Sequence, residues 1–98
     1  MKSKNYKKTE HLLKEYIIYN KILELREEKE IEDKVEKINK AMDCLTNLER
    51  KIITEFFINN KNMLQISREI QLTREYTSRI KTAAIRKMEQ VLFGSGAA

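Results

Sequence analysis

Apolar residues recur every three or four positions from about Lys8 to Phe93, the spacing that places them along one side of an α-helix. The chain contains no Pro and only two Gly, and both Gly lie within its last five positions. Very little therefore interrupts a helix over most of the sequence. The pattern predicts an all-α fold.

The first segment, residues 8–39, has no helix breaker and carries opposite charges three or four positions apart. It predicts one long helix, or two helices in line, with a kink at "REEKE", residues 26–30, which includes no apolar residue. Before the kink the apolar positions form a broad stripe: Leu12, Leu13, Tyr16, Ile17, Tyr19, Ile22, Leu23 and Leu25. After it they follow the 4, 3, 4 spacing of a narrow seam: Ile31, Val35, Ile38 and Met42.

A shorter helix is predicted to follow. The stretch "TNLE", residues 46–49, fits a capping box, so a helix should begin near Asn47. It should end at Asn59 and Asn60, because Asn tolerates left-handed backbone geometry. The residues expected on its buried side are Leu48, Ile52, Ile53, Phe56 and Phe57.

Two further helices are predicted before residue 94. Asn62 and Gln65 mark the start of a short helix that ends near Gln71, and Thr73 caps a last helix from Arg74 to about Phe93. The short helix should bury Met63, Ile66 and Ile70, and the last should bury Thr77, Ile80, Ala84, Met88 and Val91.

We therefore expect three regions. Residues 1–41 form a long N-terminal helix for packing or dimerisation, residues 42–93 a three-helix domain, and residues 94–98, "GSGAA", a flexible tail of the kind left by expression cloning. The apolar stripe of the first region must be covered. A helix of about 30 residues spans about 45 Å, more than the second region can cover, which favours pairing with another copy over packing within one chain.

The charge is unevenly distributed along 98 residues, a length that suits one domain. The net charge of +5 divides into +4 for residues 1–8, −3 for residues 9–58 and +4 for residues 59–98. Two basic ends around an acidic middle favour a polyanionic partner at one face of the molecule.

Several classes of function find little support. No apolar run approaches the roughly 18 residues of a membrane span, and "MKSKNYKK" is not followed by the apolar part of a signal peptide, so we expect a cytoplasmic protein. Cys44 and His11 are the only Cys and His, so neither a disulfide nor a metal site is expected. The absence of a glycine-rich phosphate loop and of clustered catalytic side chains argues against an enzyme or a cofactor.

The last two predicted helices have the spacing of a helix-turn-helix, whose second helix enters the DNA major groove by its N-terminal end. Arginine there can pair with guanine, and Glu, Ser and Thr can contact other base edges. The residues expected to read bases are Arg74, Glu75, Tyr76, Ser78 and Arg79. Those expected to contact phosphate are Lys61, Arg68, Thr73, Lys81, Thr82, Arg86 and Lys87. A solvated basic face of a helical bundle is the alternative, weighed equally for Arg86 and Lys87.

The stretch "MLQISREIQLTREYTSRIKTAAIRKME", residues 63–89, resembles the promoter-reading region 4 of sigma-70-type factors. The matching positions are Leu64, Ile66 or Ser67, Ile70, Leu72, Thr73, Ile80, Ala84, Ile85, Lys87 and Met88, and "LTNLERKIITEFF", residues 45–57, resembles the preceding helix. The resemblance implies that Arg74, Glu75, Ser78 and Arg79 touch bases. Gln71 stands where that family has a turn glycine. Thr77 stands where it has a buried Val, so the Thr77 hydroxyl needs a hydrogen-bond partner.

The chain is too short to hold a DNA-melting domain as well, so we do not expect a complete sigma factor. Residues 8–25 together with the helix-turn-helix resemble small phage and prophage regulators of the ArpU/RinA type. We expect a transcriptional regulator that binds double-stranded DNA, with RNA polymerase and a second copy as further partners. The alternatives are a phage small terminase subunit, and an adaptor that binds RNA polymerase without touching DNA.

Overall fold

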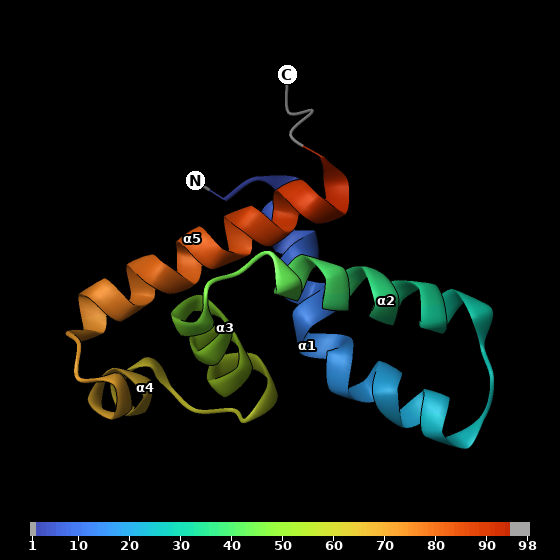
Figure 1. Ribbon diagram of the computed structural model, residues 1–98, viewed down its shortest axis with the longest axis horizontal. Coiled ribbons are helices and arrows are strands. Elements are labelled where there is room, and N and C mark those ends of the chain that lie inside the picture. Colours follow the sequence, from blue (N-terminus) through green and yellow to red (C-terminus); the bar gives the residue numbers. More distant parts are fainter. Residues whose placement is uncertain (1, 95–98) are drawn as a thin grey trace.

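A computed structural model describes residues 2–94, and in this part of the chain all regular structure is helical (Figure 1). The elements are α1 (Lys4–Leu25), α2 (Lys29–Asp43), α3 (Asn47–Ile53), the π-helical turn η1 (Thr54–Ile58), α4 (Met63–Ile70) and α5 (Arg74–Phe93). The predicted all-α class is confirmed. Of the predicted tail, Gly94 ends α5, and residues 95–98 lie outside the described residues.

The N-terminal segment is a helical hairpin, so the expectation of one long helix, or of two in line, is wrong. The chain leaves helical geometry at the predicted break, with extended backbone at Arg26 and Glu28, and α2 turns back along α1 (Figure 1). Folding back lets the two apolar stripes cover each other. The argument that a single helix about 45 Å long needs a second copy to cover its stripe therefore no longer applies. Tyr16 on α1 donates a hydrogen bond to Asn39 on α2, and Lys34 lies 5.4 Å from the ring centre of Tyr19.

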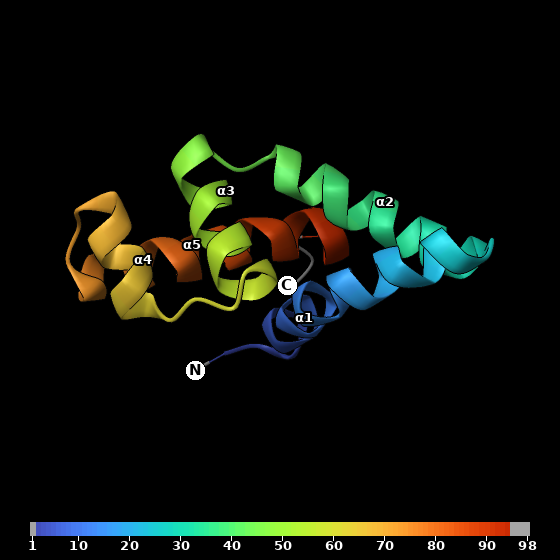
Figure 2. The same cartoon turned by 90° about the horizontal axis from the view of Figure 1, so that it is seen from below.

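Helix α5 is the element that the others share. It packs against α1, α2, α3 and α4; Figure 1 shows it along the upper side of the molecule, and Figure 2, seen from below, shows it running across the middle behind α3. One buried cluster joins the hairpin to the later helices: Tyr6, Leu13, Ile38, Ala41, Leu45, Ile53, Phe57, Ala84, Ile85 and Met88. The division into residues 1–41 and 42–93 stays a sequence prediction, and the two segments contribute to this single core.

The capping box of α3 is formed as predicted. The Thr46 hydroxyl accepts from the Glu49 N–H at 3.2 Å, and the Glu49 carboxylate accepts from the Thr46 N–H at 2.8 Å. Helix α3 then continues directly into η1, where the Asn59 N–H bonds to the Thr54 carbonyl five residues back. The chain leaves this helix through Asn60, which has a φ of 57°, so the predicted left-handed end is confirmed.

In the turn between α4 and α5, Gln71 takes the backbone conformation that the turn requires. Its φ of 58° and ψ of 43° are left-handed, the conformation that glycine takes at lowest cost. The Gln71 N–H bonds to the Arg68 carbonyl at 3.3 Å, and the Leu72 N–H bonds to the Ser67 carbonyl at 3.0 Å. These two bonds make a Schellman motif, which ends α4 and fixes the direction of the turn.

Two expected burials are wrong, and one buried residue was not expected. Leu48 is 39 % exposed and Val91 is 45 % exposed, whereas Ile85, which was not expected inside, is fully buried. Leu48 lies in the first turn of α3, and Val91 lies in the last turn of α5. Ile85 is buried together with its neighbour Ala84 because α5 is covered from two directions, by the hairpin and by α3.

We predict that Gln71→Gly raises the free energy of unfolding by about 0.5–1 kcal/mol, because glycine relieves the left-handed backbone at some cost in unfolded-state entropy. Urea denaturation would measure this change. Gln90→Gly is the matched control, since Gln90 is exposed on α5 in helical geometry, and it should lower stability by up to about 1 kcal/mol. Stabilisation by both substitutions, or by neither, would contradict the role given to the Gln71 backbone.

A second prediction concerns pH. Burial opposes ionisation of Glu49, but the Thr46 N–H and the Lys87 ammonium outweigh it and hold the pKa of this carboxyl below its ordinary 4.5. A lowered folded-state pKa stabilises the protein above pH 4.5, and this contribution is lost as the pH falls through the folded-state value.

Glu49→Gln keeps a side chain that can accept from Thr46 and removes the titration. We expect the wild type to lose more stability than Glu49→Gln between about pH 6 and pH 3, measured by thermal unfolding. The pKa values of the Glu36 and Glu55 carboxyls are also lowered, by Lys40 and by Lys61 respectively, so both proteins should lose some stability. Identical pH profiles would show that Glu49 does not contribute.

Candidate nucleic-acid interface

Helices α4 and α5 are joined by the three residues 71–73, which gives the short turn of a helix-turn-helix. The Thr73 hydroxyl accepts from the Tyr76 N–H at 3.1 Å and caps α5, as predicted. The buried Thr77 hydroxyl donates to the Thr73 carbonyl at 2.7 Å, so the partner that this hydroxyl needs is supplied by the helix itself. The start of α5 is therefore fixed by local bonds, and its first turn is left exposed.

One side of α5 faces away from the core from the first turn of the helix to Arg86. Glu75, Arg79, Thr82 and Arg86 are spaced 4, 3 and 4 apart and lie on this outer side. A shallow groove of about 310 Å³ runs along it, lined by Ser78, Arg79, Thr82, Ala83 and Arg86. A single helix that projects a continuous polar side is what insertion into a major groove requires.

Of the five residues predicted to read bases, only Ser78 and Arg79 line the groove on this outer side, and the other three lie in the first turn of α5. Arg74, Glu75, Tyr76 and Arg79 are exposed, Tyr76 by 53 %, whereas Ser78 is half-buried at the edge of the groove. Ala83 lines the same groove and was not singled out from the sequence. Its place could have been predicted from the sequence, because Ala83 follows Arg79 by four residues and so lies on the same side of α5. A small residue there lets a ligand approach the helix backbone closely.

The arginines fall into two groups. Arg26 pairs with Glu28 at 2.7 Å, and Arg50 donates to the Met42 carbonyl at 3.4 Å, so both are used within the fold. The other four are exposed on α4 and α5, and within residues 2–94 none of them has an ion pair or a side-chain hydrogen bond: Arg68, Arg74, Arg79 and Arg86. Every arginine of the helix-turn-helix is therefore free to meet a ligand.

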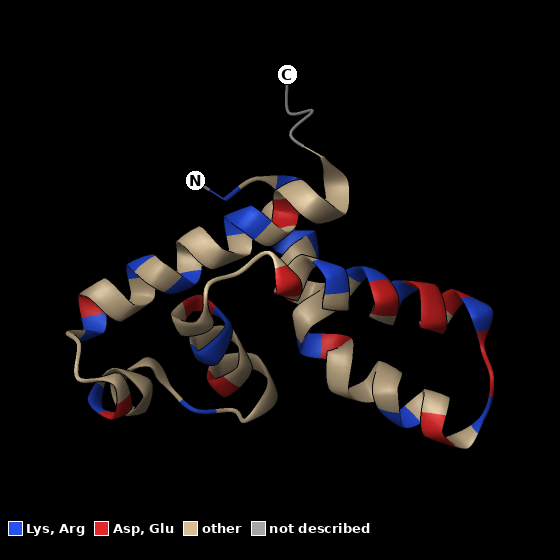
Figure 3. Cartoon of the chain, in the orientation of Figure 1, with Lys and Arg blue, Asp and Glu red and all other residues tan. Residues whose placement is uncertain are grey.

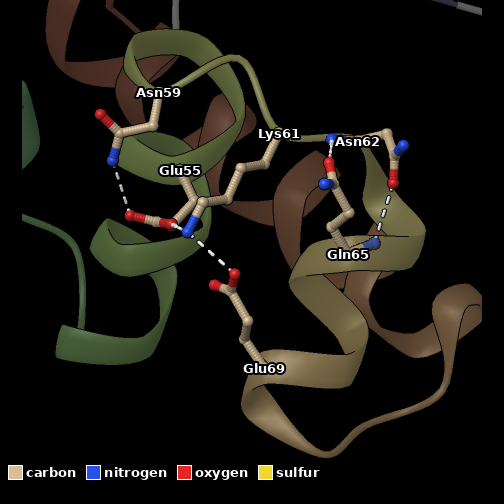
Figure 4. Close-up of polar contacts among 6 residues, drawn as sticks. All are labelled: Glu55, Asn59, Lys61, Asn62, Gln65 and Glu69. Carbon is tan, nitrogen blue, oxygen red and sulfur yellow. Dashed lines mark hydrogen bonds and ion pairs between the residues drawn. The ribbon is translucent and has the colours of Figure 1, made fainter.

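Lys61, predicted to contact phosphate, is instead held between two carboxylates (Figure 4). It pairs with Glu55 on η1 and, at 2.8 Å, with Glu69 on α4, and these hydrogen bonds raise the pKa of its ammonium. Asn59 donates to the same Glu55 carboxylate at 2.7 Å. The cluster ties η1 to α4 and offsets the charge of Lys61 locally.

Lys81 points toward the hairpin and not toward the outer side of α5. Its position, four residues after the buried Thr77, puts it on the inner side, 4.3 Å from the ring centre of Phe56. Burial lowers the pKa of its ammonium, and the nearby Lys2 and Lys14 charges lower it further. Lys81, which was expected to contact phosphate, is therefore half-buried on the inner side of α5.

The remaining predicted phosphate contacts separate by position. Arg68 and Arg86 are exposed, and Thr82 lines the groove. Lys87 bonds to Glu49 at 2.9 Å and so connects α5 to the capping box of α3. Figure 3 shows basic residues recurring along α5 and on α4, which together present the positive charge of this end of the molecule.

The helices of residues 2–94 are too polar, or too short, to cross a bilayer. In the comparisons with known proteins, Bacteriocin UviA of Clostridium perfringens is 34 % identical over 62 residues, which are 63 % of this chain and 33 % of that protein. The chain thus spans about a third of the length of this relative. No solved structure matches.

The family Sigma-70, region 4 matches residues 41–90, which include α3, η1, α4 and nearly all of α5. This range is the one in which the capping boxes, the Schellman turn and the exposed α5 side occur, and it takes in just over half of the 98 residues. The chain belongs to the Sigma-70, region 4 family of helix-turn-helix domains.

Proposed function

We propose that this protein is a sequence-specific DNA-binding transcriptional regulator in which α5 reads the major groove of double-stranded DNA. The observation that supports this most directly is the set of four free arginines on α4 and α5. Arginine pairs bidentately with guanine or with phosphate, and side chains held by other contacts cannot do so without losing them.

The order of the groups along α5 suggests their roles. Arg74, Glu75, Tyr76 and Arg79 occupy the first two turns, the part that enters the groove when a recognition helix docks by its N-terminal end. Glu75 can accept from cytosine, and the exposed ring of Tyr76 offers an apolar contact to a thymine methyl group. Glu75 also suits the positive end of the helix dipole, so its charge does not argue against a helix start beside DNA.

Phosphate contacts would flank this reading surface. Arg68 lies on α4, and Arg86 lies two turns beyond Arg79. Thr73 caps the start of α5, and the first backbone N–H groups of this helix offer a phosphate oxygen a place to bind. Such contacts position the protein without distinguishing sequences.

The regulator would act in the cytoplasm. Its Sigma-70, region 4 domain would also bind RNA polymerase as a second partner. An adaptor that binds polymerase alone, or a small terminase subunit that assembles into rings, are the competing proposals. Selection of binding sites from random duplex DNA, at two salt concentrations, separates the regulator from the adaptor, and assembly into a ring-forming oligomer would point to the terminase subunit. Enrichment of a motif supports the regulator, whereas no enrichment at either salt favours the adaptor.

We predict that Arg74→Ala or Arg79→Ala lowers discrimination between the selected site and random DNA by about 1–3 kcal/mol, because a base contact is lost. Fluorescence anisotropy with both duplexes measures this difference. Lys21→Ala is the control, since Lys21 lies on α1, outside the helix-turn-helix. An equal loss on both duplexes would assign the arginine to phosphate instead.

Arg68 and Lys61, both expected from the sequence to contact phosphate, should respond differently to substitution, because Lys61 is already paired with Glu55 and Glu69. Arg68→Ala should weaken binding to all duplexes alike and reduce the slope of log K against log salt by about 0.9, the effect of losing one phosphate contact. Lys61→Ala should change this slope less and instead lower the melting temperature, because Glu55 and Glu69 lose their shared partner. Equal slope changes would show that Lys61 leaves its carboxylates to bind DNA.

A further inference from the structure

A second hollow lies at the base of the hairpin, outside the residues that match the family. It has a volume of about 640 Å³ and is formed by α1 from Lys4 to Tyr19, the middle of α2 and the end of α5. Its apolar lining consists of Leu12, Tyr19, Leu92 and Phe93. We call it the basal groove.

The rim of the basal groove is strongly basic. It carries five lysines and one histidine, all exposed: Lys4, Lys7, Lys8, Lys34, Lys37 and His11. None of the five lysines pairs with a carboxylate within residues 2–94. Lys8 lies 5.9 Å from the ring centre of Phe93, so the lysine stems extend the apolar surface while their charges reach the rim. The groove therefore suits an apolar side chain that arrives with several acidic ones.

The tip of the hairpin, residues 24–33, supplies that combination on the same chain. It contains six acids and two bases, and Figure 3 shows acidic residues gathered where α1 turns into α2. Leu25 at this tip is 82 % exposed, the largest exposure among the large apolar residues of the described chain. An apolar residue so placed, with acids on both sides, matches the basal groove in both polarity and charge.

One side of α1 links the two features. Lys4, Lys8 and His11 lie at its start, and Ile18, Ile22 and Leu25 follow at spacings of 7, 4 and 3, which keep all six on one side of the helix. Ile18 is 51 % exposed and Ile22 is half-buried. This outer side of α1 is thus basic at one end and apolar at the other, so an antiparallel copy would place unlike ends together.

We propose that two copies of this chain pair through the outer sides of their α1 helices, antiparallel about a two-fold axis. Leu25 of each copy enters the basal groove of the other, and the acidic tip faces the lysine rim. Each copy gives and receives the same contact, so the interface closes on itself as a dimer. The proposal does not depend on DNA binding, because the groove lies at the C-terminal end of α5, and the 20-residue helix carries Arg74 about 30 Å away.

Sedimentation equilibrium of the full chain over a range of concentrations tests the pairing, and exchanging the charges tests its geometry. A groove variant, Lys4→Glu with Lys7→Glu, and a tip variant, Glu24→Lys with Glu27→Lys, should each weaken self-association about tenfold or more, because like charges then face each other. An equimolar mixture of the two variants should associate again, since each basic surface then finds an acidic one. Circular dichroism would verify that both variants fold.

Leu25→Ser should also weaken the dimer, whereas Leu64→Ser, at a leucine 44 % exposed on α4, should not. Added salt should weaken wild-type self-association, because the charges of rim and tip are exposed. A chain that stays monomeric at all concentrations would overturn the proposal. A dimer that is indifferent to both charge variants, or a mixture that fails to associate, would overturn it as well, and neither result would bear on the role of Arg74 and Arg79 in DNA binding.

Discussion

Helix α5 packs against four other helices, and this packing sets the orientation of the side chains that it presents to solvent. Its inner side carries Thr77, Ala84, Ile85 and Met88, all of which are buried. Because these contacts come from the hairpin as well as from α3, the rotation of α5 about its own axis is fixed over most of its length. That rotation decides which side chains face outward, and it is the reason that Arg79 is exposed while Lys81, two residues later, lies against Phe56.

The relative position of α4 and α5 rests on short-range bonds. The left-handed Gln71 and the two bonds of the Schellman motif end α4, and the Thr73 hydroxyl begins α5 two residues later. The Thr77 hydroxyl, fully buried, is satisfied by the Thr73 carbonyl, so the core is not left with an unpaired hydroxyl at the helix start. Lys61 adds a longer tie between η1 and α4. Together these contacts keep the short α4 from shifting along α5, which a precise reading surface needs.

The basic residues divide into those that are paired within the fold and those that are free at the surface. Most of the bases near the core are engaged, as with Lys87 and Glu49 or Arg50 and the Met42 carbonyl. The free arginines gather on α4 and α5, and the free lysines gather around the basal groove at the other end of α5. A net charge of +5 therefore resolves into two separate basic surfaces of different character. One is a convex helix side rich in arginine, suited to DNA, and the other is a concave apolar groove rimmed by lysine, suited to an acidic protein surface.

The helices and most of their ends could be predicted from the sequence, because capping, the lack of Pro and the helical period act within a few residues. Thr46, Asn62 and Thr73 start helices where predicted, and the region 4 resemblance followed from local spacing. The fold-back of α1 and α2 and the inward orientation of Lys81 could not be predicted from the sequence, since both depend on which distant surface covers an apolar stripe. The pairing of Lys61 with Glu55 and Glu69 was hidden for the same reason. Sequence spacing shows which residues share a side of one helix, but the partner of that side is chosen by packing across the whole chain.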